Sequence, residues 1–396
     1  MTYVPLHVHS EYSLLDGLSQ TSQISRRLED IETDTCVLTD HGTVSGAVDF
    51  SKTLRNASQK PILGCEFYLC MGDASEQSPE NRDLVHQVVI AKNLQGWKDL
   101  LRLVSQSNRT DQFYYKPRID FDQLKAVAAN GNLISFSGHL GSYLGNAALE
   151  NSDDRFLSNA ALKLQDMFGR GNFFIEIQLI DSQNNEGARI AAERLREIAV
   201  QTGIPPVATP DAHYPTREAA EDQRVLLCTS LKKTIGQVHR ELKEGKSRSL
   251  KSFFSSDNYH IPSYEEMSQF HTEEELQNTI VIANMCESYD ILGAPNPPTF
   301  SCPANYEAQS YLRHLCKIGW SQKMQHIEKN GADFNRYGDR VQKELQVFEE
   351  AGLSGYFLIV QDILQFCRKE GYLTGPGRGS AAGCMVSYLI GITQID

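Results

Sequence analysis

Histidine and acidic side chains lie in, or directly after, a series of short apolar runs that are typical of β-strands. The first run is Leu6-His7-Val8-His9, where two imidazoles two residues apart on a strand point to the same face. The others carry Asp40, His41, Glu66, His86, His139, Asp211 and His213. Side chains from so many strands converge on one small volume at the rim of a β/α barrel, whereas an open sheet spreads its strand ends along a line. The pattern therefore favours a barrel.

Strand-like and helix-like segments alternate up to about residue 228, which predicts an α/β fold with a parallel sheet or barrel. The expected strands are 3–8, 36–38, 61–69, 84–91, 133–136, 173–179 and 206–208, and the expected helices are 21–30, 46–57, 95–107, 155–168 and 186–201. Four prolines between 289 and 303 indicate a linker, and the pattern beyond it predicts helices over 306–329, 334–351 and 356–370. We expect a domain over 1–285, a linker over 286–303 and a second, mainly helical segment over 304–396.

Charge and cysteine usage narrow the class of protein. The net charge of -12 argues against a protein that coats nucleic acid through overall positive charge, although a local basic groove remains compatible with it. The nine cysteines include no Cys-x-x-Cys pair, so no structural thiolate zinc site is expected. The basic segment 231–251 is expected to be a solvated loop or hairpin, with a nucleic-acid contact as the alternative. Without a signal peptide or a membrane-length apolar run, we expect a cytoplasmic protein with no membrane partner.

Imidazole and carboxylate ligands without thiolate suit zinc, manganese or iron in a catalytic role. A carboxylate such as that of Glu66 can bridge two ions. Ions held a few ångströms apart activate water and stabilise both oxygens of an in-line phosphoryl displacement. The residues therefore point to a centre that hydrolyses phosphate esters.

The motifs HVHS-x(5)-DG, TDHG, GCEFY, HQVVIA, SGHLG and TPDAHY occur in the order of a polymerase-and-histidinol-phosphatase (PHP) domain, which this chain resembles. The residues of these motifs are similar to those of the PHP domain at the start of bacterial DNA polymerase III alpha subunits. YYKPRID, FFIEIQ, YFLIVQDIL and GPGRGSAAG extend the resemblance across essentially the whole chain.

This resemblance implies a distorted seven-stranded β/α barrel that holds two or three divalent ions, zinc first and manganese or iron next. It assigns His7, His9, Glu66 and Asp211 to one ion, Glu66, His86 and His139 to a second, and Asp16, His41 and His213 to a third. Many relatives have cysteine at the position of His139. The catalytic residues would be His7, His9, Glu66, His86 and Asp211, and the activity would be 3′→5′ exonuclease. Asp40 would orient His41 or cap a turn.

The glycine-rich loop GPGRGS precedes an apolar helix, and backbone N–H groups at such a helix start favour phosphate. It lacks the Gly-Lys-Ser/Thr ending of a P-loop, so a P-loop ATPase is not expected. By resemblance, Arg378, Gly379 and Ser380 are candidate contacts to a deoxynucleoside triphosphate in the start of a polymerase palm. The one Asp-x-Asp, at Asp120 and Asp122, fits a helix N-cap better than a magnesium site.

Three functions follow. The first is the N-terminal segment of a DNA polymerase III alpha subunit, a DNA-directed DNA polymerase and nucleotidyltransferase of DNA replication. Its PHP domain would trim a primer–template 3′ end, and the segment would be unable to polymerise alone. Its partners would be DNA, deoxynucleoside triphosphates, other replisome subunits and the rest of the alpha chain, with magnesium in the complete palm. The second is a stand-alone phosphatase of a small phosphomonoester. The third is a non-catalytic scaffold that metals only stabilise.

Overall fold

The computed structural model describes residues 3–150, 152–246, 251–294, 296–328 and 334–395. The chain divides into two compact units, Met1–Leu292 and Gly293–Asp396. This division falls inside the range 286–303 that the prolines indicated as a linker. The start of that range packs with the first unit, because the backbone N–H of Glu287 donates to the carbonyl of Lys92 at 2.7 Å.

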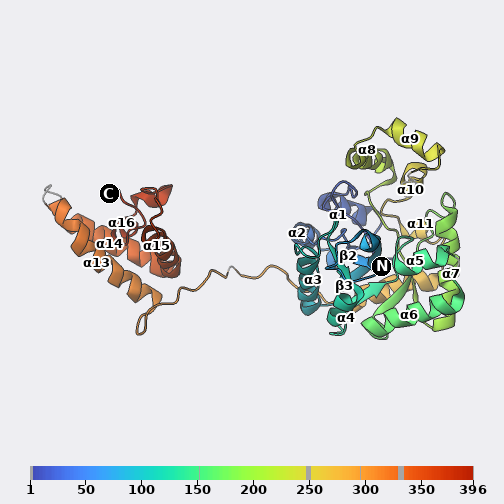
Figure 1. The fold of residues 1–396 in the computed structure, drawn as a ribbon, viewed down its shortest axis with the longest axis horizontal. Coiled ribbons are helices and arrows are strands. Elements are labelled where there is room, and N and C mark those ends of the chain that lie inside the picture. Colours follow the sequence, from blue (N-terminus) through green and yellow to red (C-terminus); the bar gives the residue numbers. More distant parts are fainter. Residues whose placement is uncertain (1–2, 151, 247–250, 295, 329–333, 396) are drawn as a thin grey trace. The chain divides into compact units, whose positions relative to one another are not determined.

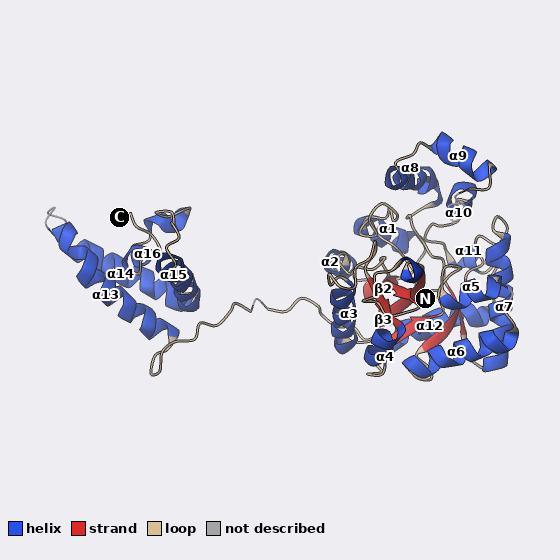
Figure 2. Ribbon diagram, viewed as in Figure 1, coloured by secondary structure: helices blue, strands red, loops and turns tan. Residues whose placement is uncertain are grey.

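A single seven-stranded sheet forms the centre of the first unit (Figures 1 and 2). Its strands are β1 (Thr35–Leu38), β2 (Lys60–Cys70), β3 (Leu84–Ala91), β4 (Arg118–Asp120), β5 (Leu133–Phe136), β6 (Phe173–Ile177) and β7 (Pro206–Ala208). They follow the order β1-β2-β3-β5-β6-β7, with β4 paired to β2. All pairs are parallel except those of β3, which is antiparallel to β2 and β5. A parallel return after β2 needs a long crossover, usually a helix, and the connection to β3 contains only a short 3₁₀ turn.

The segment before β1 joins the two ends of the sheet. Val8 bridges Leu38 at the end of β1 on one side and Ala212, just after β7, on the other, both in parallel. The N–H of Ala212 donates to the carbonyl of His7 at 3.0 Å, and the N–H of His9 donates to the carbonyl of Ala212 at 2.8 Å. The prediction of a regular strand over 3–8 is therefore wrong, but these isolated bridges close the sheet into the expected distorted barrel.

Helices surround the barrel (Figure 2). They are α1 (Thr21–Asp30), α2 (Ala47–Asn56), α3 (Leu94–Ser107), α4 (Phe121–Ala128), α5 (Tyr143–Leu149), α6 (Asp154–Phe168), α7 (Glu186–Thr202), α8 (Ala220–Leu231), α9 (Ile235–Lys243), α10 (Lys251–Ser255), α11 (Tyr264–Met267) and α12 (Glu273–Met285). The expectation of a loop or hairpin over 231–251 is wrong where α9 forms. Thr234 and Gln237 make a capping box that begins this helix. Residues 247–250 of that segment lie outside the described residues.

Two apolar clusters separate the inside of the barrel from its helical cover. Val88 and Ile90 of β3, Ile134 of β5 and Phe174 of β6 pack in the inner cluster. The alternate residues of the same strands, such as Val89 of β3, pack in an outer cluster with the surrounding helices. Helix α12 joins the inner cluster and packs against the side where the parallel strands begin. Polar side chains lie at the opposite edge of the barrel, where the parallel strands end.

Asp120 has the N-cap role that its position suggested. Its carboxylate accepts the N–H of Gln123 at 2.8 Å, and the Gln123 side chain completes a capping box at the start of α4. This confirms that the Asp-x-Asp sequence begins a helix.

The second unit is helical. It contains α13 (Ala308–Glu328), α14 (Phe334–Glu350), α15 (Ser354–Lys369) and α16 (Met385–Leu389). They pack around a core that includes Leu312, Leu345 and Leu358. Gly319 lets α13 approach α16 closely, because a Cβ there would lie 2.0 Å from the carbonyl oxygen of Leu389. The helix predicted directly after GPGRGS starts later, at Met385, after a 3₁₀ turn over Ser380–Gly383. Among the described residues, no helix combines the length and apolar character needed to cross a membrane.

Candidate metal centre

All nine predicted ligands meet at the edge of the barrel where the parallel strands end, and Glu66 stands at their centre. Its Oε2 lies 3.3 Å from Nε2 of His9 and 3.6 Å from Nε2 of His7. Its Oε1 lies 2.9 Å from Nδ1 of His86 and 2.9 Å from Nε2 of His139. One buried carboxylate therefore faces five imidazoles, these four and that of His41, which lies against Oε2.

Asp211 completes a first group of ligands. Its Oδ1 lies 3.4 Å from Nε2 of His7 and 3.3 Å from Nε2 of His9. These three side chains are buried, and their inward atoms lie within 4.8 Å of one another. Asp211 has a positive φ of 51°, a left-handed conformation that non-glycine residues seldom adopt. Such strain persists only where the surrounding structure imposes it, as in a functional site.

A second group forms around Asp16. Its Oδ2 lies 2.9 Å from Nε2 of His41 and 3.7 Å from Nε2 of His213. Nδ1 of His41 faces Oε2 of Glu66 at 2.8 Å, so His41 links the two groups. Asp16 comes from the loop before α1, and the backbone of this loop is tied to the segment after β7 by the N–H of Leu18 and the carbonyl of His213 at 2.7 Å.

The reversed direction of β3 explains the position of His86. This residue lies near the beginning of β3, opposite Tyr68 of β2. Because β3 is antiparallel, its beginning meets the ends of its parallel neighbours at the same edge. His86 thus lies within its strand, one of the two kinds of position expected for the ligands, and its side chain reaches Glu66.

The centre leaves buried polar atoms without hydrogen bonds. Nε2 of His7, Nε2 of His9, Nδ1 of His41, Oε2 of Glu66 and Oδ1 of Asp211 all have no hydrogen-bond partner. Orphaned atoms of this kind cost about 1–3 kcal/mol each, so folded proteins rarely retain them. Here they are all lone-pair donors aimed at one volume. The residues present therefore fit divalent cations, which such atoms would ligate.

The pKa shifts of His9 and Asp211 agree with this chemistry. Burial, reinforced by His41 and His213, lowers the pKa of His9 to about 3, so its ring is neutral at pH 7. Burial alone would raise the pKa of Asp211, but the imidazoles of His7 and His213 hold it below the usual range. His9 and Asp211 therefore have the protonation states that metal binding requires, whereas the carboxylates of Asp211 and Glu176 outweigh burial and raise the pKa of His7.

Polar residues behind the ligands hold the imidazoles in place. Oε1 of Glu176 lies 2.7 Å from Nδ1 of His7, and Thr209 donates its hydroxyl to the same oxygen. Nδ1 of His9 lies 3.2 Å from the hydroxyl of Ser13, and that hydroxyl donates to Asp40 at 2.7 Å. Asp40 therefore acts on the centre through Ser13. The same hydroxyl accepts the N–H of His41 at 3.1 Å.

Glu176 was missed as a functional residue in the sequence. It lies in the FFIEIQ motif, between apolar residues of β6, and is buried. An acidic residue inside an otherwise apolar strand was the available signal, because a buried carboxylate needs a partner.

Glu176→Gln should weaken metal binding by about 10–100-fold, because carboxylates that orient a ligating histidine contribute that much to affinity. The amide keeps the shape of the side chain but removes the charge that fixes the proton on Nδ1 of His7. Zinc affinity from competition with a chromophoric chelator measures the effect. Glu193→Gln, on the exposed face of α7, is the matched control and should leave the affinity unchanged.

Four further residues stand at the rim. The ring of Tyr68 lies 5.0 Å from that of His86, and its hydroxyl accepts a hydrogen bond from Nζ of Lys116 at 2.8 Å. On another side, the ring of Phe253 lies 4.9 Å from that of His213 and 4.5 Å from that of Tyr259. The centre is therefore bordered by an exposed cation and by half-buried aromatic rings.

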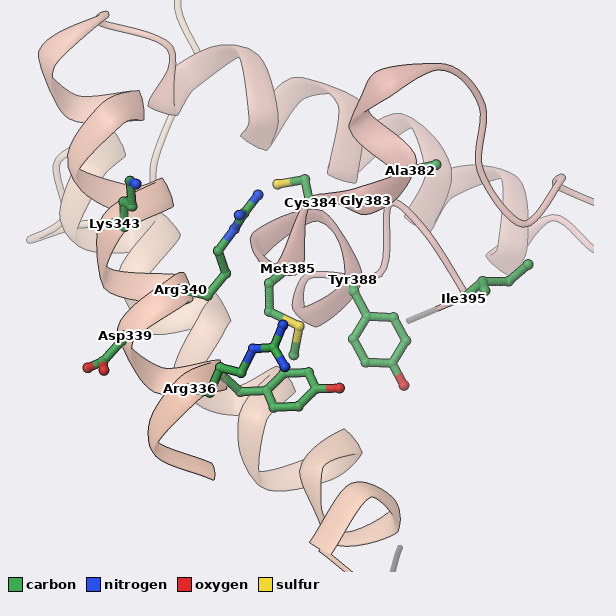
Figure 3. Close-up of a pocket in the computed structure, with 11 residues that line it drawn as sticks. Arg336, Asp339, Arg340, Lys343, Ala382, Gly383, Cys384, Met385, Tyr388 and Ile395 are labelled. Carbon is green, nitrogen blue, oxygen red and sulfur yellow. The ribbon is translucent and has the colours of Figure 1, made fainter. Parts of the chain in front are cut away.

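The candidate nucleotide contacts lie in the second unit. Arg378, Gly379 and Ser380 are exposed, and Gly379 has a positive φ of 70°. The turn that follows them borders a pocket of about 560 Å³ against α14. Arg336 and Arg340 extend from α14 into the space beside Met385 and Tyr388, as Figure 3 shows. Lys343 also lines the pocket.

Comparison with known families agrees with this fold. Residues 5–179 match the PHP domain family, so the barrel unit contains a PHP domain. Residues 310–396 match the bacterial DNA polymerase III alpha NTPase domain. The resemblance expected from the motifs is therefore confirmed: the chain is similar to PHP domains over its first part and to DNA polymerase III alpha over its last part.

Curated relatives extend the similarity across the whole chain. The DNA polymerase III subunit alpha of Treponema pallidum is 34% identical over 401 residues, which cover 100% of this chain and 32% of the relative. The subunits of Borreliella burgdorferi and Aquifex aeolicus are 33% and 31% identical, with 33% and 34% of their lengths covered. The chain thus spans about a third of the length of these relatives. A solved amidohydrolase from Chromobacterium violaceum aligns at a TM-score of 0.37 and 13% identity, covering 54% of this chain and 88% of that one.

Proposed function

We propose that the barrel unit is a metal-dependent phosphodiesterase that removes nucleotides from DNA 3′ ends, within a polymerase of the DNA polymerase III alpha type. The observation that carries this proposal is the convergence of orphaned imidazole and carboxylate atoms on one edge of the barrel. His7, His9, Glu66 and Asp211 would hold one ion, and Asp16, His41 and His213 would hold another. Zinc is the first candidate, with manganese and iron next.

The residues of this chain would bind and orient the substrate around that centre. Bound divalent ions supply activation of water and stabilisation of charge on the phosphate. Lys116, exposed at the rim, carries a positive charge toward which a phosphodiester would be drawn. Phe253 and Tyr259 offer aromatic faces on which a terminal base can stack, which favours a nucleic-acid end over a small phosphomonoester.

Lys116→Met should raise KM for a DNA 3′ end by roughly tenfold while changing kcat little, because a charged contact to phosphate contributes about 1.5–3 kcal/mol. Steady-state kinetics on a primer–template measure KM and kcat separately. Lys125→Met is the control, because Lys125 is an exposed residue of α4. Equal losses in both variants would show that Lys116 has no specific role.

The second unit would contribute to a deoxynucleoside triphosphate site. Its basic pocket borders the turn after Arg378, Gly379 and Ser380, and phosphate is the ligand that such a set of cations and N–H groups favours. Polymerisation also needs carboxylates that hold magnesium, and the one Asp-x-Asp of this chain caps α4 in the other unit. We therefore expect nucleotide binding without DNA synthesis from the chain alone.

The test compares substrates on the purified chain after elemental analysis. A 3′-mismatched primer–template and histidinol phosphate are supplied side by side to the wild type and to His9→Ala. Release of mononucleotides by the wild type, lost in His9→Ala, is the expected result. Phosphate release from histidinol phosphate alone would replace the proposal with a small-molecule phosphatase, and bound metal with neither activity would replace it with a scaffold.

A further inference from the structure

His139 differs from the other imidazoles of the centre in the way its ring is held. Nδ1 of His139 accepts a hydrogen bond from the backbone N–H of Gly141 at 2.9 Å. Nε2 of the same ring lies 2.9 Å from Oε1 of Glu66. Nδ1 therefore has a hydrogen-bond donor as its partner, and Nε2 lies against a carboxylate oxygen.

These partners fix the position of the ring proton. A neutral imidazole carries one N–H, and a backbone amide can only donate a hydrogen bond. Nδ1 of a neutral His139 must therefore be the acceptor, and the proton must be on Nε2, which faces Oε1 of Glu66. A metal ligand must present a lone pair. The nitrogen of His139 that faces the centre has none to offer.

Three other histidines show the opposite arrangement. Nδ1 of His7 faces a carboxylate oxygen of Glu176 at 2.7 Å, and Nδ1 of His213 faces the carbonyl oxygen of Asp211 at 2.9 Å. Nδ1 of His9 faces the hydroxyl of Ser13, whose own proton is donated to Asp40. In each case the proton is on Nδ1, and Nε2 directs its lone pair into the centre.

Ring rotation does not offer His139 an easy alternative. A half turn of the ring would place carbon atoms opposite the N–H of Gly141 and opposite Glu66, which removes the hydrogen bond from Gly141 and the polar contact with Glu66. The backbone of Gly141 also lies against the ring, since a Cβ at Gly141 would be 2.7 Å from Cε1 of His139. The ring is thus held with Nδ1 toward Gly141 and Nε2 toward Glu66.

From this geometry we infer that His139 is a positioning residue that presents its Nε2–H to Glu66 and does not ligate metal. The second metal position, which the resemblance assigned to Glu66, His86 and His139, then keeps only two ligands from the chain. The centre therefore binds two ions tightly instead of three. The inference deepens the proposed function, because it assumes that the centre holds metal. It replaces the expectation that the His139 imidazole takes over the ligand role of the cysteine found in relatives.

Counting zinc on the full chain tests this inference. The protein is loaded with Zn²⁺ and dialysed, and zinc per chain is measured by elemental analysis in the wild type, His139→Gln and His139→Cys. Glutamine keeps an N–H near the position of Nε2 but is a poor zinc ligand. Cysteine can offer a thiolate. Thermal unfolding of each variant confirms that it is folded.

We expect two zinc ions in the wild type, two in His139→Gln and three in His139→Cys. Three ions in the wild type with two in His139→Gln would overturn the inference, because the imidazole would then be a ligand. Two ions in a wild type that hydrolyses no phosphodiester would instead refute the proposed function and support the assigned ion count. The two failures are therefore distinguishable.

The proton on His139 can also be observed directly. Long-range ¹H–¹⁵N spectra of protein labelled at histidine report which ring nitrogen is protonated, and the signal of His139 is identified by its loss in His139→Gln. We expect the Nε2–H form before and after zinc loading. A change to the Nδ1–H form on loading would overturn the inference.

Discussion

Glu66→Gln is expected to remove most bound zinc and to lower kcat/KM for phosphodiester cleavage by at least about 10³-fold. Glu66 faces His7 and His9 through one oxygen and His86 through the other, so the substitution affects every part of the centre. The amide has the same shape but no charge, and its NH₂ group would face an imidazole lone pair or an ion. Zinc per chain and cleavage of bis-p-nitrophenyl phosphate are the two measurements.

Glu11→Gln is the matched control for this experiment, because Glu11 is exposed on the loop that follows His9. It should retain the zinc and the activity of the wild type. If Glu66→Gln kept its full zinc content and activity, the carboxylate would not bridge the ligands, and the assignment of the centre would be wrong.

Arg118→Met is expected to destabilise the barrel unit by roughly 3–5 kcal/mol, because three buried carbonyls lose their donor at a cost of about 1–3 kcal/mol each. Arg118 is 0% exposed. Its guanidinium donates to the carbonyls of Gln112 at 3.1 Å, Glu76 at 2.8 Å and Asn81 at 2.5 Å. Methionine fills part of the space but leaves these buried carbonyls without a donor.

The measurement is urea unfolding followed by tryptophan fluorescence. The chain has two tryptophans, so a Trp320→Phe background leaves Trp97 of α3 as the reporter of the barrel unit. Arg109→Met is the control, since this arginine is largely exposed and pairs with exposed Asp111. Its effect should stay within about 0.5 kcal/mol. If Arg118→Met also changed the free energy of unfolding by no more than about 0.5 kcal/mol, the three carbonyls would have found other donors.

Segments with strong local patterns were predicted well. Helix 21–30 matches α1, and the strand at 84–91 matches β3. Strand β4 was not predicted, because three residues are too few to show an alternating pattern. Helix α9 was predicted as a loop or hairpin, because its many charged residues made a short amphipathic pattern hard to recognise. These differences follow from the length and composition of the segments, which limit what local periodicity can show.

The amino-acid sequence by itself determined which side chains are available for the centre and that they belong to separate strand ends, because residue type and period-two alternation are local properties. Only the tertiary structure decided the direction of β3, the closure of the barrel through Val8, and the place of Glu176 behind His7. It also decided the proton position on His139, because that depends on the N–H of Gly141 and the carboxylate of Glu66 meeting the same ring. Strand direction, closure and proton position all depend on groups distant in the chain, whose distances and orientations are set by packing.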